Sequence, residues 1–283
     1  MRHLFKAWEE LELALGEKTL VLILDYEGTL VPASAAPVRL PIAKRKQLVR
    51  LSQIAAVKTV VIDCRPAAEL KRLVGVPGII YFGHQGLEAE GQGAEFDLVH
   101  PEASAAKALV RKIRGRLEQV LKGVPGTTLS REDFLLRVSS ARVAAKRAEG
   151  VRAAVEKVLR PYLRSSRLVV TGSKNGFEVR PALRWNKGTT VLWLYGKILS
   201  KTAEEKILPL YIGDGRTDED VFRSMKPVGV SVKVAADPQE AISSDADYLL
   251  LSPGEVFQVI ARLSELKSRP ANQPSARAVG SIS

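Results

Sequence analysis

The sequence of 283 residues has a single cysteine, Cys64, and only three histidines, His3, His84 and His100. One cysteine excludes an internal disulfide and agrees with a reducing compartment. Three histidines leave little material for a His-rich metal site or for a Ser/His/Asp triad. Any chemistry must therefore come mainly from other residue types.

Long apolar runs are also missing, since no stretch approaches the roughly 20 residues that a membrane-spanning helix needs. Residues 1–18 alternate charged and apolar side chains at helical spacing, unlike the apolar centre of a signal peptide. Hydrophobic residues make up 46% of the chain, which is enough for a well-packed core. We therefore expect a soluble, cytoplasmic, monomeric protein with no membrane association.

The net charge of +12 is concentrated in one segment. Between Pro101 and Lys174, 17 Lys and Arg residues stand against 6 Asp and Glu residues, a net charge of +11. Such a segment could steer an anionic substrate, or it could be the solvated face of Arg-rich helices. Few aromatic residues for base stacking and no recognisable binding motif argue against nucleic acid as a partner.

Strand and helix patterns alternate at both ends of the sequence, as in the βαβ units of a parallel sheet. Between them lie two long amphipathic helix patterns, at 102–121 and 141–163, with short strand patterns. We predict an α/β fold, a Rossmann-like doubly wound parallel sheet core with an inserted α/β cap domain. The predicted segments are the core at 1–87 and 177–267, the basic cap at 88–176, and a disordered Pro/Ser/Ala-rich tail at 268–283.

Three apolar runs of the predicted core end in an aspartate. They are LVLILD at Asp25, TVVID at Asp63 and LPLYIGD at Asp214. The carboxyl ends of parallel strands meet at one edge of the sheet, where open α/β sheets bind their ligands. Three acids at that edge favour a metal and a phosphate, although each aspartate alone would also suit a helix N-cap or a turn.

Four motifs occur in the order found in the haloacid dehalogenase superfamily of phosphatases. They are DYEGTL from Asp25, the Arg65 of IDCRP, NKG from Asn186, and GDGRTDED from Gly213. More narrowly, YFGHQGLE, FEVRP and YIGDGRTDEDVF resemble trehalose-6-phosphate phosphatases. The resemblance covers most of the predicted core and is weak in the basic segment. It implies a hydrolase of phosphoric monoesters whose substrate is a phosphosugar, most simply trehalose 6-phosphate.

The resemblance also implies a role for each matching residue. Asp25 would be the nucleophile that forms an aspartyl phosphate, Glu27 the general acid, and Lys187 the cation beside the phosphoryl oxygens. Mg²⁺ would be the cofactor, held by Asp25, Asp214 and the backbone carbonyl of Glu27, with Asp218 holding a metal-bound water. The implied phosphate and substrate contacts are Gly28, Thr29, Asp63, Arg65 and, from the cap, Glu178.

Three positions depart from the family pattern: Glu27 replaces Asp, Asp63 replaces Ser or Thr, and Gly215 replaces the second Asp of GDD. Glu27 is longer by about 1.5 Å, and a misplacement of about 1 Å can cost on the order of 100-fold in rate. An ionised carboxylate repels a phosphate oxygen, so Asp63 should be protonated, turned away or facing metal. The alternative function is a degenerate member that binds a sugar phosphate or a protein partner without turnover.

Overall fold

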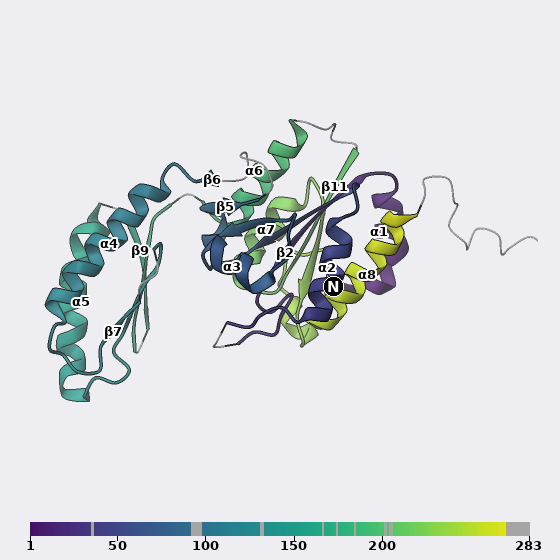
Figure 1. The fold of residues 1–283 in the computed structure, drawn as a ribbon. Helices are drawn as coiled ribbons and strands as arrows, with labels where there is room; N and C mark the ends of the chain where they lie inside the picture. Colours follow the sequence, from purple (N-terminus) through teal and green to yellow (C-terminus); the bar gives the residue numbers. More distant parts are fainter. Residues whose placement is uncertain are drawn as a thin grey trace, which may run out of the picture. The chain divides into compact units, whose positions relative to one another are not determined.

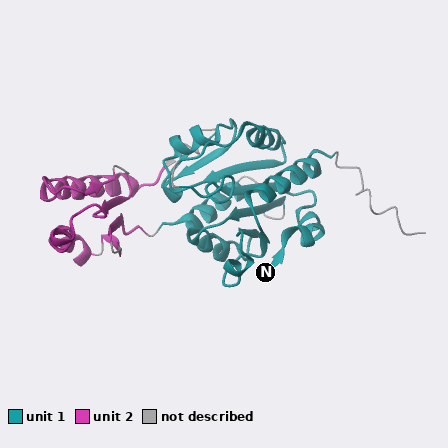
Figure 2. Cartoon of the chain, turned by 90° about the horizontal axis from the view of Figure 1, so that it is seen from below, with its two compact units in different colours: residues 1–98, 185–283 teal, residues 99–184 magenta. Residues whose placement is uncertain are grey.

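The protein divides into two compact units, and the second is inserted into the first (Figure 2). The first unit comprises Met1–Leu98 and Trp185–Ser283, and the second comprises Val99–Arg184. The computed structural model describes residues 1–34, 37–91, 98–130, 133–165, 167–173, 175–183, 185–200, 203 and 206–269.

The inserted unit differs in its bounds from the segment 88–176 that the sequence predicts. Its end moves beyond Pro181 because strand β10 (Gly176–Pro181) pairs antiparallel with β9 (Leu168–Ser173), so this strand cannot belong to the core. Of the predicted disordered tail, residues 270–283 lie outside the described residues.

The first unit is built on a nine-stranded sheet with the order β1-β13-β12-β11-β2-β3-β4-β5-β6. From β1 to β4 in this order the neighbouring strands are parallel, and β5 is antiparallel to β4. The chain order reverses between β2 and β11, whose carboxyl ends therefore border a topological switch point. The strands are β1 (Arg2–His3), β2 (Thr19–Asp25), β3 (Val57–Ile62), β4 (Ile80–Gly83), β5 (Glu88–Glu90), β6 (Leu98–Val99), β11 (Ile207–Gly213), β12 (Val230–Val234) and β13 (Tyr248–Leu250).

Helices cover both faces of this sheet (Figure 1). One apolar cluster joins the even-numbered leucines of β2 to α1, α2, α3 and α8, and another joins Val21 and Ile23 to α6 and α7. Since both faces of β2 are buried, its sequence is an unbroken apolar run. The predicted doubly wound α/β fold is thus confirmed. The helices are α1 (Trp8–Leu15), α2 (Ile42–Ser52), α3 (Ala67–Val74), α6 (Lys187–Leu199), α7 (Glu219–Met225) and α8 (Pro253–Ser268), with 3-10 turns η1 (Leu4–Ala7), η2 (His84–Gly86), η4 (Arg216–Asp218) and η5 (Pro238–Ala241).

The second unit has its own antiparallel sheet of order β7-β8-β10-β9 and its own apolar core. Its other elements are β7 (Thr128–Leu129), β8 (Leu136–Ser139), α4 (Ala103–Val120) and α5 (Ala145–Arg164). Arg111, Lys112 and Arg116 on α4 and Lys157 and Arg160 on α5 are exposed, so these charges face solvent. Within the described part of the chain, no helix combines the length and apolarity needed to cross a membrane.

Candidate active site

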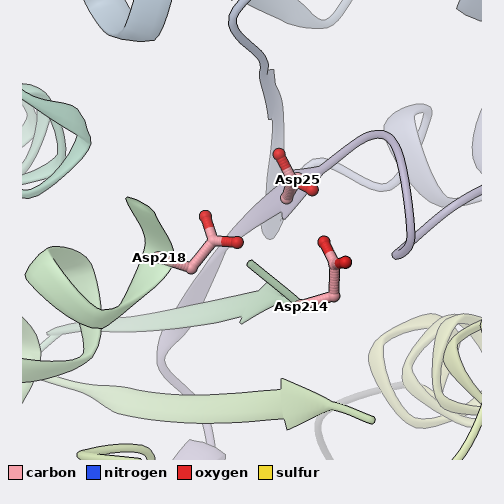
Figure 3. A group of neighbouring side chains, drawn as sticks. All are labelled: Asp25, Asp214 and Asp218. Atoms are coloured by element: carbon pink, nitrogen blue, oxygen red, sulfur yellow. The ribbon is translucent and has the colours of Figure 1, made fainter. Parts of the chain in front are cut away.

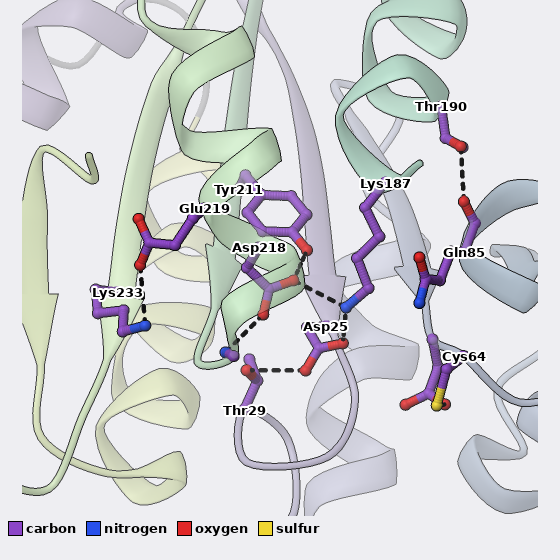
Figure 4. A network of polar contacts seen from close by, with 12 residues as sticks. Asp25, Thr29, Cys64, Gln85, Lys187, Thr190, Tyr211, Asp218, Glu219 and Lys233 are labelled. Atoms are coloured by element: carbon purple, nitrogen blue, oxygen red, sulfur yellow. Dashed lines mark hydrogen bonds and ion pairs between the residues drawn. The ribbon is translucent and has the colours of Figure 1, made fainter. Parts of the chain in front are cut away.

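Asp25 ends β2 at the switch point, and its buried carboxylate contacts a buried lysine (Figure 4). Nζ of Lys187 lies 2.6 Å from Oδ1 of Asp25 and 2.8 Å from Oδ1 of Asp218. The Thr29 hydroxyl donates to Oδ2 of Asp25 at 3.4 Å. Burial raises the pKa of Asp25 well above its usual range, and the Lys187 charge opposes this shift. The pKa of Lys187 is raised because the two carboxylates outweigh its burial, so Lys187 is an ammonium ion.

The NKG motif explains how Lys187 reaches this position. Asn186 is the N-cap of α6: its side chain accepts a hydrogen bond from Thr189 N at 2.9 Å, and its own N–H donates to the Thr189 hydroxyl at 2.8 Å. Lys187 follows as the first helical residue and is only 4% exposed. A Cβ at Gly188 would lie 2.6 Å from the backbone oxygen of Asp220, so only glycine lets α6 lie this close to α7.

Asp218 is a buried carboxylate at the end of η4 whose two oxygens accept three hydrogen bonds. The Tyr211 hydroxyl donates to its Oδ1 at 2.5 Å, and the backbone N–H of Gly215 donates to its Oδ2 at 2.8 Å. Burial acts to raise the pKa of Asp218, but Lys187, Tyr211 and Gly215 together lower it below the usual range. Sequence reasoning missed Tyr211, because an aromatic residue inside an apolar strand reads as a core residue.

Asp25, Asp214 and Asp218 ring a common space, and each offers a carboxylate oxygen within 4.8 Å of the others (Figure 3). Burial raises the pKa of Asp214, and the Asp218 charge adds to that shift. The loop after β2 closes one side, since Gly28 has a φ of +82° and a Cβ there would lie 2.0 Å from Oδ2 of Asp214. Three hard oxygen donors beside a close-approaching backbone fit a small divalent cation.

Glu27 and Asp63 are held by one arginine. Nη1 of Arg65 lies 3.0 Å from both carboxylate oxygens of Asp63, and Nη2 donates to Oε2 of Glu27. The other Glu27 oxygen accepts the Ser34 N–H at 2.8 Å. Burial acts to raise the pKa of Glu27, but the bonds from Ser34 and Arg65 lower it below the usual range. Glu27 is therefore ionised in this arrangement.

This arrangement adds a partner for Asp63 that the sequence-based interpretation did not include. We expected Asp63 to be protonated, turned away from the phosphate or facing metal; the pairing with Arg65 is a further way to balance its charge, which we did not consider. Arg65 in turn is bound to two carboxylates, which differs from a side chain presented to phosphate. The remaining predicted residue, Glu178, lies on β10 of the second unit, where it pairs with Arg137 at 3.4 Å.

Comparisons with known proteins point to one family. The family model described as trehalose-phosphatase matches residues 23–253, from β2 to the start of α8. Trehalose-phosphate phosphatase B of Arabidopsis thaliana is 29% identical over 276 residues, which cover 94% of this chain and 72% of the relative.

Two solved structures show the same fold. The C. albicans trehalose-6-phosphate phosphatase C-terminal domain has a TM-score of 0.66 at 22% identity, covering 91% of this chain and 97% of that one. A haloacid dehalogenase-like hydrolase from Bacteroides thetaiotaomicron has a TM-score of 0.59 at 18% identity, covering 87% and 100%. At sequence identities this low, the two structures show only that the fold is shared. The family match, which spans well over half of the sequence, confirms the resemblance seen in the motifs: this chain belongs to the trehalose-phosphatase family.

Proposed function

We propose that the protein is a Mg²⁺-dependent phosphatase of sugar phosphates that acts through an aspartyl phosphate at Asp25. Membership of the trehalose-phosphatase family supports hydrolysis of a phosphoric monoester, and the names of the relatives support trehalose 6-phosphate as the substrate. The observation that carries the proposal is the buried contact of Lys187 with Asp25 and Asp218, beside Asp214.

In the first half-reaction, a carboxylate oxygen of Asp25 bonds to phosphorus as the bond from phosphorus to the sugar oxygen breaks. The departing sugar oxygen takes up a proton. In the second half-reaction, water attacks the same phosphorus, and inorganic phosphate leaves as the Asp25 carboxylate is restored. Lys187 holds Asp25 in place and balances its charge throughout.

The metal would be held by Asp25, Asp214 and the Glu27 backbone carbonyl, with Asp218 holding its water. Bound Mg²⁺ would supply positive charge next to the phosphoryl oxygens. The phosphate itself would meet Thr29 and the backbone N–H groups around Gly28. Glu178 of the inserted unit remains our proposed sugar contact, on the strength of the family resemblance.

Glu27 is our candidate for proton transfer. As an ionised carboxylate it is ready to accept a proton from the attacking water. In the first half-reaction the same carboxyl group would deliver a proton to the departing sugar oxygen, for which it must first take one up.

The test is phosphate release from trehalose 6-phosphate, sucrose 6-phosphate and glucose 6-phosphate, with millimolar Mg²⁺ or with EDTA. We expect the fastest release from trehalose 6-phosphate, none with EDTA, and none from Asp25→Asn. The matched control is Asp245→Asn, because Asp245 pairs with Lys226 and Arg223 away from the site. Release that is equal for all three sugars, or that persists in Asp25→Asn, would refute the proposal.

One observation favours a second candidate, a phosphosugar-binding protein without turnover. The guanidinium of Arg65 is already bound by two carboxylates, which leaves Lys187 to balance the remaining acids of the site. Calorimetric titration with trehalose 6-phosphate separates the two candidates. Micromolar binding without phosphate release would support the binder.

A further inference from the structure

Arg65 joins two carboxylates that come from different parts of the core. Glu27 lies in the loop after β2, and Asp63 directly follows β3. The Asp63 side chain is only 3% exposed, that of Arg65 16%, and that of Glu27 28%. A nearly buried carboxylate needs a bonded partner, and Arg65 supplies it.

The geometry of the guanidinium allows it to serve both acids at once. One edge nitrogen, Nη1, contacts both oxygens of Asp63, and the other, Nη2, contacts Glu27. The five donors of a guanidinium lie in one rigid plane, so fixing one edge on Asp63 also fixes the direction of the other edge. A lysine ammonium has no such plane and could not transmit this orientation.

Backbone hydrogen bonds hold Asp63 and Arg65 in position. Oδ1 of Asp63 also accepts the Arg65 N–H at 2.8 Å, which makes a tight turn after β3. The Gln85 N–H donates to the Asp63 carbonyl at 2.9 Å, and the His84 N–H donates to the Arg65 carbonyl at 2.9 Å. Asp63 and Arg65 are thus tied to the turn that follows β4, while Ser34 N holds the second oxygen of Glu27 at 2.8 Å.

We propose that Asp63 and Arg65 form a clamp that positions the Glu27 carboxylate, and that neither binds the phosphate. This inference rests on the proposed function, in which Glu27 transfers protons. Glu27 has one more rotatable bond than the aspartate of the family pattern, so its carboxylate has more orientations to lose. The clamp removes that freedom, because Arg65 donates to Oε2 of Glu27 while the Ser34 N–H donates to Oε1.

The test compares kcat and KM for trehalose 6-phosphate in clamp variants. Arg65→Met should lower kcat by about tenfold or more, because a misplaced group costs rate, and should change KM by less than about threefold. A phosphate ligand would behave differently: losing its charge would raise KM by about tenfold or more. Arg65→Lys should recover only part of kcat, since it keeps the charge without the fork.

The decisive measurement is a double-mutant cycle between the two clamp residues. Asp63→Asn should lower kcat by itself, but the Asp63→Asn/Arg65→Met protein should be no slower than Arg65→Met alone. The matched control is Lys71→Met, which removes an exposed ion pair with Glu90 and should leave both constants unchanged. Effects of the two substitutions that multiply, or a rise in KM with unchanged kcat, would overturn the clamp.

A readout without activity keeps failure of the clamp separate from failure of the proposed function. The melting-temperature shifts of Glu27→Gln and Asp63→Asn should be non-additive in the otherwise unchanged protein. The two shifts should become additive in the Arg65→Met background, because Glu27 and Asp63 are coupled by their shared bonds to Arg65. Additive shifts in both backgrounds would refute the clamp, whatever the protein hydrolyses.

Discussion

A Cβ atom at Gly28 would lie 2.0 Å from Oδ2 of Asp214, so the loop after β2 contacts the carboxylate that follows β11. Gly28→Ala must therefore displace Asp214, and it also places a side chain at a φ of +82°. Mg²⁺ bound at the proposed site should raise the melting temperature of the unsubstituted protein, because it binds the folded state. For Gly28→Ala we expect a melting temperature lower by several degrees and loss of this stabilisation by Mg²⁺. Differential scanning fluorimetry with and without Mg²⁺ measures both effects.

Gly196→Ala is the matched control for this substitution. Gly196 lies inside α6, and a Cβ there would meet nothing within 4 Å. Alanine in a helix interior is more stable than glycine by roughly 0.5–1 kcal/mol, so the melting temperature should rise and the Mg²⁺ effect should remain. An undiminished Mg²⁺ shift in Gly28→Ala would contradict the proposed metal site.

The Mg²⁺ effect should also depend on pH. Burial raises the pKa of both Asp25 and Asp214. A raised pKa means that the folded protein favours the protonated acids, so their contribution to stability falls as pH rises through the raised values. A metal needs them deprotonated. The Mg²⁺-induced rise in melting temperature should therefore be larger at about pH 8 than at about pH 5.5. An equal rise at both pH values, or any rise in Asp214→Asn, would count against this site.

Much of the fold could be predicted because its elements carry local signals. The predicted strands at 20–24 and 208–213 correspond to β2 (Thr19–Asp25) and β11 (Ile207–Gly213), whose two buried faces give continuous apolar runs. Asp25 and Asp214 then follow from strand ends. The end of the inserted segment was misplaced because β10 reads equally well as a core strand until its pairing with β9 is known.

A site residue could be predicted from the sequence where its backbone position places it in the site. It could not be predicted where its role depends on which side chain it pairs with. The NKG motif predicts Lys187 at the start of a helix because N-capping by Asn186 is a local requirement, and the family resemblance implies its role. The pairing of Arg65 with Asp63 and Glu27 depends on a turn and a side-chain direction that composition does not reveal. The bond from the Tyr211 hydroxyl to Asp218 could not be predicted for the same reason.

The single cysteine gives a prediction that is independent of catalysis. Partial desolvation, reinforced by the Asp63 carboxylate 3.4 Å from Sγ, raises the pKa of Cys64 to about 12, although the residue is exposed. Because the residue is exposed, solvent screens part of this effect, and the thiolate fraction at about pH 8 should be on the order of tenfold or more below that of a free cysteine. Iodoacetamide should therefore alkylate the folded protein roughly tenfold more slowly than the urea-unfolded protein. Asp63→Asn should speed the reaction; equal rates in folded and unfolded protein would show an ordinary thiol.

Gly215 provides the last prediction, because the family pattern carries a second aspartate at this position. A Cβ at Gly215 would lie 3.5 Å from Oδ2 of Asp218, an ordinary contact, and a φ of −92° suits any residue. An aspartate therefore fits beside Asp214 and Asp218. Without Mg²⁺, Gly215→Asp should lower the melting temperature through repulsion of like charges, and with Mg²⁺ it should raise both that temperature and the affinity for the metal. Gly215→Asn separates charge from shape and should do neither; identical Mg²⁺ titrations of the two variants would show that position 215 does not act on the metal.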